Sequence, residues 1–197
     1  MQPTDLRVVK TLKQIDRALL ACLVESPFEK ITVEQLCKAA LINRSTFYKY
    51  YTSKYDLMER YLARALDGFR RQVDVTFVNA SPETIQNLLY QKNFENTLNF
   101  LYKHKAEYTL LWSIPLEEGV FGRMVDAVHD AILEKLDAQD PPDPYADLYA
   151  RLFASDMMTL VRWWFHYEGR ITAKEVQDIM RKNMKQGMFR TFREQMR

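Results

Sequence analysis

The chain has 197 residues, of which 47% are apolar and 13% aromatic, and it contains only five glycines. This composition can fill a packed core and excludes a disordered chain, and the absence of long alternating apolar and polar runs predicts an all-α fold. The net charge of +2 is unevenly divided: residues 1–60 hold ten Lys and Arg against seven Asp and Glu, whereas the remainder holds eighteen against nineteen.

The first predicted helix covers residues 6–24, where apolar residues recur at helical spacing. It ends at Ser26-Pro27-Phe28, because the residue before a proline disfavours helical geometry. We expect this helix to cover the core of a small N-terminal domain, and Phe28 to close the base of that domain.

Residues 31–56 contain three helix starts. Thr32, with Gln35 three positions later, has the spacing of a capping box. Asn43 is a candidate cap for a second helix, and Ser53 is a candidate cap for a third. Two short helices separated by a three-residue turn form the helix-turn-helix pattern.

The second of these helices, residues 44–51, has two different faces. At about 100° per residue, Phe47 and Tyr51 lie opposite its hydroxyl and lysine side chains, so that one face can be buried. The sequence contains no acidic residue between Glu34 and Asp56, although four basic residues fall inside that interval. A cationic surface without carboxylates is suited to the phosphate backbone of a nucleic acid.

These residues resemble the DNA-binding region of the TetR (tetracycline-repressor) family of bacterial transcription regulators. RSTFYKYY, residues 44–51, is similar to the family's recognition helix, and the match continues into SKYDLM. The resemblance implies a three-helix helix-turn-helix DNA-binding domain at residues 1–53. It further implies a larger helical effector-binding and dimerisation domain at residues 54–197.

The resemblance also implies a role for each polar residue of the motif. The residues expected to reach base edges in the major groove are Arg44, Ser45, Tyr48 and Lys49. The residues expected to hold phosphates are Thr32, Thr46, Tyr50 and Lys54. The alternatives are that Arg44 is a solvated cation at a helix start and that Tyr48 belongs to the core.

Leu41 is a departure from the family pattern, because the family usually has glycine after the first motif helix. A positive φ at that position costs a branched residue about 1 kcal/mol. We expect Leu41 to offset this strain by packing into the small core.

The third motif helix is expected to continue from Ser53 to about residue 78 and so to connect the two domains. Further helices are predicted at residues 81–103, 108–114, 120–138 and 145–168, with a last one after the Thr172 cap. The prolines at positions 141, 142 and 144 require a loop before residue 145.

The final two helices are more apolar than one chain needs to bury, so we predict an intermolecular four-helix bundle in a homodimer. The alternative is an ordinary intramolecular core. The candidate interface residues are Leu160, Trp164, Val176, Met180, Met184 and Met188.

The resemblance implies an effector cavity in the C-terminal domain. The aromatic and apolar candidates for its lining are Phe94, Leu98, Tyr108, Trp112, Trp163 and Tyr167. The alternative is that these residues form plain core, because an aromatic stripe at helical spacing usually packs inside a protein.

Catalytic and metal sites are not expected. The three histidines lie on separate segments without acids or thiols at ligand spacing, and Cys22 and Cys37 read as reduced, buried thiols. We find no phosphate loop, nucleophile constellation or paired carboxylates, and therefore expect no cofactor and no enzyme activity. No apolar stretch is long enough for a membrane span, so we expect a cytoplasmic protein.

The leading hypothesis is a ligand-responsive DNA-binding regulator, a repressor that binds a palindromic double-stranded operator as a homodimer. A first alternative is a regulator of the same fold that is controlled by a protein coactivator instead of a small molecule. A purely structural helical protein is a second alternative, but it gives no reason for the strip without acids around residues 44–51.

Overall fold

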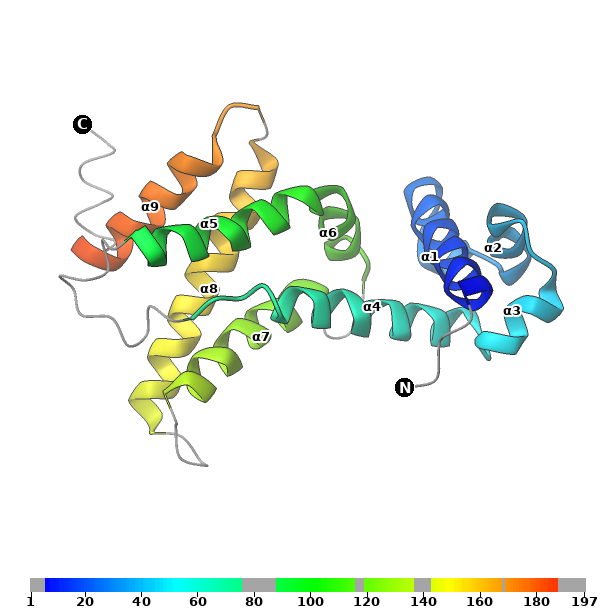
Figure 1. The fold of residues 1–197 in the computed structure, drawn as a ribbon, viewed down its shortest axis with the longest axis horizontal. Coiled ribbons are helices and arrows are strands. Elements are labelled where there is room, and N and C mark those ends of the chain that lie inside the picture. Colours follow the sequence, from blue (N-terminus) through cyan, green and yellow to red (C-terminus); the bar gives the residue numbers. More distant parts are fainter. Residues whose placement is uncertain (1–5, 76–87, 116–118, 137–142, 168, 188–197) are drawn as a thin grey trace.

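The computed structural model describes residues 6–75, 88–115, 119–136, 143–167 and 169–187. These residues form helices and no strands, which confirms the predicted all-α fold (Figure 1). None of the described helices is long and apolar enough to cross a membrane. The elements are α1 (Leu6–Glu25), the short 3-10 helix η1 (Phe28–Lys30), α2 (Val33–Ala40), α3 (Arg44–Tyr50), α4 (Lys54–Arg70), α5 (Leu88–Lys103), α6 (Lys105–Trp112), α7 (Val120–Lys135), α8 (Pro144–His166) and α9 (Ala173–Gln186).

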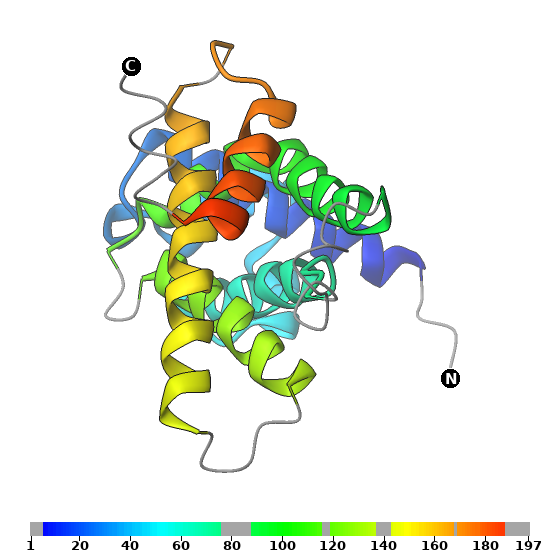
Figure 2. The same cartoon turned by 90° about the vertical axis from the view of Figure 1, so that its left-hand side faces the viewer.

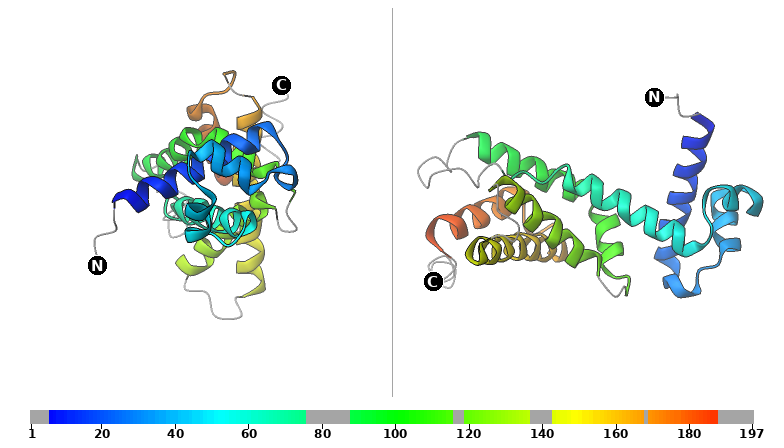
Figure 3. Two further views of the ribbon diagram at one scale, coloured as in Figure 1. Left: turned by 90° about the vertical axis from the view of Figure 1, so that its right-hand side faces the viewer. Right: turned by 90° about the horizontal axis from the view of Figure 1, so that it is seen from below.

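The molecule is elongated, with α1, α2 and α3 gathered at one end (Figures 1 and 3). Helix α4 begins beside α3 and runs into the larger helical body, where it packs on α7. The long helix α8 packs on both α7 and α9 (Figure 2). Helix α4 is therefore the continuous element between the motif and the rest of the chain.

Local caps determine where several helices begin. Thr32 forms the predicted capping box, in which its backbone N–H donates to Gln35 Oε1 at 2.8 Å. Ser53 accepts from the backbone N–H of Asp56, and Thr172 forms a second capping box with Glu175. Asn43 stands at the N-cap of α3, but its side chain makes no cap hydrogen bond, so that part of the prediction was wrong.

Helix α4 ends at Arg70, which is earlier than the predicted end near residue 78. In a longer helix the carbonyl of Gln72 would accept a backbone N–H. It accepts instead from Thr97 Oγ1 at 2.5 Å. This bond ties the end of α4 to α5. The predicted helix start at Ser81 lies outside the described residues.

Polar side chains join α1, α4 and α6 at the junction between the two ends of the molecule. Arg64 on α4 donates to Asp16 on α1 at 2.6 Å, and the Tyr61 hydroxyl on α4 donates to Glu107 on α6. Burial raises the pKa of Asp16, and it also raises the pKa of Tyr61, to which Glu107 contributes through hydrogen bonding. The three helices are thus connected by hydrogen bonds in a partly dry environment.

The turn between α2 and α3 is strained. Leu41 has φ 55° and ψ 43°, the left-handed geometry that favours glycine, and its N–H closes the end of α2 on Cys37 and Lys38. Its side chain is 89% exposed, so the expectation that it packs into the small core was wrong. The cost of the left-handed backbone is therefore not offset by burial.

Replacing Leu41 with glycine should stabilise the protein by about 0.5–1 kcal/mol, because the positive φ then carries no side-chain clash. Urea denaturation would measure the change. Leu41→Ala is the matched control, since it removes the exposed side chain but keeps the clash, and it should leave stability nearly unchanged. Equal gains from both substitutions would show that the exposed leucine, and not the backbone, is the source of the cost.

Candidate nucleic-acid interface

Helix α3 is held against the small core by its aromatic residues. Phe47 is fully buried and Tyr51 is 2% exposed, and their ring centroids lie 5.7 Å apart. Burial of these two rings fixes which face of α3 turns outward. The outward face consists of the side chains predicted to reach base edges, since Arg44, Ser45, Tyr48 and Lys49 are all exposed.

Tyr48 and Arg44 lie side by side on this face. The Tyr48 ring rests edge-on against Phe47, with centroids 5.5 Å apart, yet the residue is 48% exposed. A hydrogen bond with Tyr48 raises the pKa of Arg44. The core therefore supports the base of the tyrosine while its hydroxyl stands beside a guanidinium, and both groups remain available to a partner.

The four candidates for phosphate contact have different environments. Thr32 is exposed but spends its hydroxyl on Gln35 Oε1 at 3.0 Å, within the capping box. Thr46 and Tyr50 are half-buried on the flanks of α3. Lys49 Nζ lies 5.9 Å from the centroid of the Tyr50 ring.

Lys54, the fourth candidate, has an internal role. Its Nζ donates to the carbonyl oxygens of Phe28, Glu29 and Ile31 at 2.9, 2.8 and 2.8 Å. An ammonium has three donors, so these bonds use all of them. The Phe28 and Tyr55 rings also flank the ammonium at 5.0 and 5.2 Å. We therefore reassign Lys54 from phosphate contact to fastening the start of α4 to the connection between α1 and α2.

Asp56, the acidic residue at the end of the cationic interval, is paired with hydrogen-bond donors. Asp56 accepts from the backbone N–H of Thr52 at 2.8 Å and from Arg60 Nε at 2.7 Å. These hydrogen bonds, first of all that from the Thr52 backbone, lower the pKa of Asp56. Its negative charge is thus balanced beside the motif and weakens the cationic face of α3 little.

The predicted effector-pocket residues do not converge on one site. Leu98 and Tyr108 are buried, and Trp112 stacks between Tyr108 and Phe165 in a packed chain of rings. Trp163 and Tyr167 are instead 38% and 39% exposed and contact each other on the surface of α8. The side chain of Phe94 lies outside the described residues.

Three of the predicted interface residues were misplaced. Trp164, Val176 and Met180 are 3%, 0% and 1% exposed within a single chain, so they belong to its core. Trp164 Nε1 donates to the carbonyl of Ile171 at 2.9 Å, which joins α8 to the turn before α9. Leu160 is half-buried, and the side chains of Met184 and Met188 lie outside the described residues.

Sequence reasoning missed an exposed apolar stripe along α8. Its members share one face. Four of them lie at spacings of three and four residues in the first half of the helix and are 49–71% exposed, and Trp163 and Tyr167 follow eleven or more positions later. The stripe consists of Tyr145, Leu148, Tyr149, Leu152, Trp163 and Tyr167. The signal in the sequence was that α8 is apolar nearly all round, but that pattern does not say which face is outside.

Comparison with known proteins relates the N-terminal motif to one family. Residues 15–61, from the middle of α1 into α4, match the family described as bacterial regulatory proteins, tetR family. The N-terminal motif of this chain is therefore similar to that of the tetR family. The match contains the whole of α2 and α3 and therefore the exposed face built by Arg44 and Tyr48.

Two similar proteins match this chain beyond the motif. A TetR transcriptional regulator from Streptococcus agalactiae 2603V has a similar fold, with a TM-score of 0.63 and 20% identity over 92% of this chain and 96% of that one. An uncharacterised HTH-type transcriptional regulator, YxbF of Bacillus subtilis (strain 168), is 21% identical over 165 residues. That alignment covers 83% of this chain but only 42% of the relative's length.

The described part of the chain contains no group of three or more His, Cys, Asp or Glu side chains placed to hold a metal ion. Cys37 is buried and Cys22 is half-buried, and burial raises the pKa of both thiols. A raised pKa keeps a thiol protonated and poorly nucleophilic.

Proposed function

We propose that this chain is a DNA-binding transcription regulator that acts as a repressor on a palindromic operator. The observation that carries the proposal is the outward face of α3, where Arg44, Ser45, Tyr48 and Lys49 are exposed. These residues lie in a stretch that has no acidic residue between Glu34 and Asp56. A helix with this face can enter a major groove, and an arginine can bind guanine through two hydrogen bonds. The remaining exposed groups can contact backbone phosphates.

A homodimer would supply two such helices. Exposing the apolar stripe of α8 to water is unfavourable. Pairing it with the same stripe of a second copy would bury it in an isologous four-helix arrangement that includes α9. Two recognition helices about 34–36 Å apart would then reach successive major grooves on one face of the duplex. This stripe replaces the buried residues Trp164, Val176 and Met180 in the proposed interface.

Regulation by a small molecule or a protein partner would act through α4, because this helix is shared by both ends of the molecule. An effector changes operator affinity only by as much as it prefers one arrangement of the two recognition helices over the other. The ring packing of Tyr108, Trp112 and Phe165 fills part of the region where the effector was expected. This packing favours an effector that binds elsewhere, or a protein partner.

Arg44→Ala tests the DNA-binding proposal. Selection from a random duplex library would first yield the preferred operator, and fluorescence anisotropy at fixed salt would then measure affinity. The variant should lose about 1–3 kcal/mol of discrimination at one base pair of each half-site, because a bidentate arginine contact is worth that much.

Lys135→Ala is the matched control, since it also removes one exposed positive charge but lies at the far end of α7. It should leave base preference unchanged. If Arg44→Ala also kept its full base preference, α3 would not be the reading element and the assigned surface would be wrong.

A further inference from the structure

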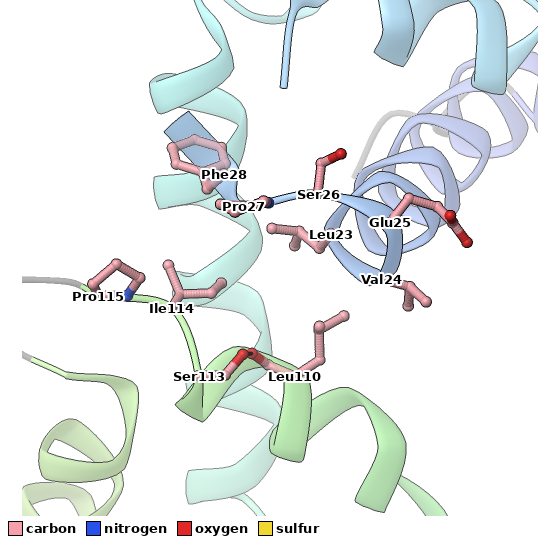
Figure 4. A pocket seen from close by; sticks show the side chains of 10 residues that line it. All are labelled: Leu23, Val24, Glu25, Ser26, Pro27, Phe28, Leu110, Ser113, Ile114 and Pro115. Atoms are coloured by element: carbon pink, nitrogen blue, oxygen red, sulfur yellow. Dashed lines mark hydrogen bonds between the residues drawn. The ribbon is translucent and has the colours of Figure 1, made fainter. Parts of the chain in front are cut away.

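A hollow of approximately 290 Å³ lies where the end of α1 and the turn after it approach the end of α6 (Figure 4). Leu23 reaches toward it from the α1 side, and Leu110 and Ile114 reach toward it from the α6 side, while α4 passes behind (Figure 4). The hollow therefore stands between the DNA-binding motif and the larger helical body.

The contact between α1 and α6 is narrow. A second hollow, of approximately 350 Å³, is lined by Leu20, Ala21 and the first half of α6, and it shares Val24 and Leu110 with the first. Val24 is 71% exposed although it stands at this junction. Because a shallow space lies on either side of the few side chains that join α1 to α6, the two helices can separate with little loss of packing contacts.

The lining of the first hollow indicates the chemistry of its occupant. Most of its walls are aliphatic, aromatic or proline side chains, with hydroxyls from Ser26 and Ser113. Glu25 is the charged residue among the ten described residues that line it. An apolar cavity of about 150 Å³ holds a benzene ring, so this volume suits about two fused rings. None of these ten lining residues is basic, so the lining offers no positive charge to pair with an anion and favours a neutral or cationic molecule.

One wall of the hollow is connected directly to the start of α4. Phe28 lines the hollow, and its carbonyl and ring are both held by the ammonium of Lys54. Lys54 is the first residue of α4, three positions after Tyr51, which anchors the recognition helix. A molecule that displaces Phe28 must therefore disturb the joint between α3 and α4.

We propose that the hollow between α1 and α6 is an effector site for a small, neutral or cationic aromatic molecule. Occupancy wedges α1 away from α6 and moves the recognition helix through Phe28 and Lys54, which lowers operator affinity. The binding step stands on the geometry of the hollow alone. The second step, the change in operator affinity, rests on the proposed DNA-binding function.

Three probes with one ring system and different charges test the site without DNA. Isothermal titration calorimetry should give measurable binding for tryptamine and indole and at least tenfold weaker binding for indole-3-acetate. Ser113→Phe places a ring in the hollow and should weaken tryptamine binding at least tenfold. Thr109→Phe is the matched control, because Thr109 is exposed on α6 and lines neither hollow, and it should bind as the parent does.

Val24→Phe provides a second variant that fills the hollow, so that the test does not depend on the folding of Ser113→Phe. Equal tryptamine affinity in the parent and in a folded filled variant would overturn the site, as would the absence of binding of all three probes at millimolar concentration. Stronger binding of indole-3-acetate than of tryptamine would overturn the assigned ligand class.

The regulatory step is read separately, by operator affinity with and without saturating tryptamine. We expect a loss of at least fivefold in the parent and in Thr109→Phe, and no change in Ser113→Phe. Unchanged affinity with tryptamine bound would overturn the regulatory step and leave the site standing. Failure of the free protein to bind any duplex would instead reject the proposed function, while the calorimetric result would still decide the site.

Discussion

Replacing Lys54 with methionine should lower the free energy of unfolding by about 2–3 kcal/mol, because hydrogen bonds to a charged group contribute about 1.5–3 kcal/mol and an unpaired carbonyl is costly. Three carbonyls lose the ammonium at once, and the bonds to two of them, Phe28 and Ile31, are partly buried. The Phe28 carbonyl still accepts from the Ile31 backbone N–H at 3.1 Å. Methionine keeps an apolar stem beside the Phe28 and Tyr55 rings, so the change isolates the ammonium. Urea denaturation followed by circular dichroism would measure the loss.

Lys30→Met is the control for this experiment. Lys30 is exposed and belongs to the segment Phe28–Lys30, in which Lys54 binds the carbonyls of Phe28 and Glu29. Its replacement should therefore change stability by no more than about 0.5 kcal/mol. A Lys54→Met protein with parental stability, but with uniformly weaker binding to every duplex and a lower salt slope, would restore the phosphate role and refute the internal one.

Leu152→Glu should convert the proposed homodimer into monomers at micromolar concentration. Leu152 is 55% exposed in the middle of the α8 stripe. In an isologous pair a single substitution places a carboxylate on each side of the seam, where two like charges lose water and repel each other. Operator affinity should fall about 100-fold or more, because the second half-site is no longer bound at high effective concentration.

Sedimentation velocity with the parent and the variant would check this result. Leu6→Glu is the matched control, since Leu6 is a 76% exposed leucine at the start of α1, and α1 lies at the other end of the molecule from α8 (Figure 1). It should sediment as the parent does. A Leu152→Glu protein that remains dimeric would place the seam on another face of the molecule.

The motif was predictable because its signals are local. Thr32 and Ser53 cap helices through atoms three residues away, so sequence spacing alone locates them. The inward turn of Phe47 likewise follows from helical periodicity. These local rules are sufficient to determine which side chains of α3 are exposed.

The role of Lys54 and the exposed face of α8 could not be predicted, because they depend on contacts between residues far apart in the sequence. Lys54 reads as a free cation in the sequence, and its carbonyl partners lie 23–26 positions earlier in the chain. Trp163 and Trp164 are adjacent on a helix that is apolar nearly all round, yet one is 38% exposed and the other 3%. Periodicity cannot choose between such neighbours, because the choice depends on where α5 and α9 pack.

Helix α4 is a long, continuous helix whose start lies beside α3 and whose end packs in the larger helical body. It has 17 residues, so at about 1.5 Å per residue it is roughly 25 Å long. If its far end is held by α5 and α7, a rotation of about 5° displaces the near end by about 2 Å, which exceeds the tolerance of a hydrogen bond to a base edge. A sub-ångström shift of α4 near its packed end is therefore magnified at α3. On the proposed function, release from DNA would then need no unfolding and no large domain movement.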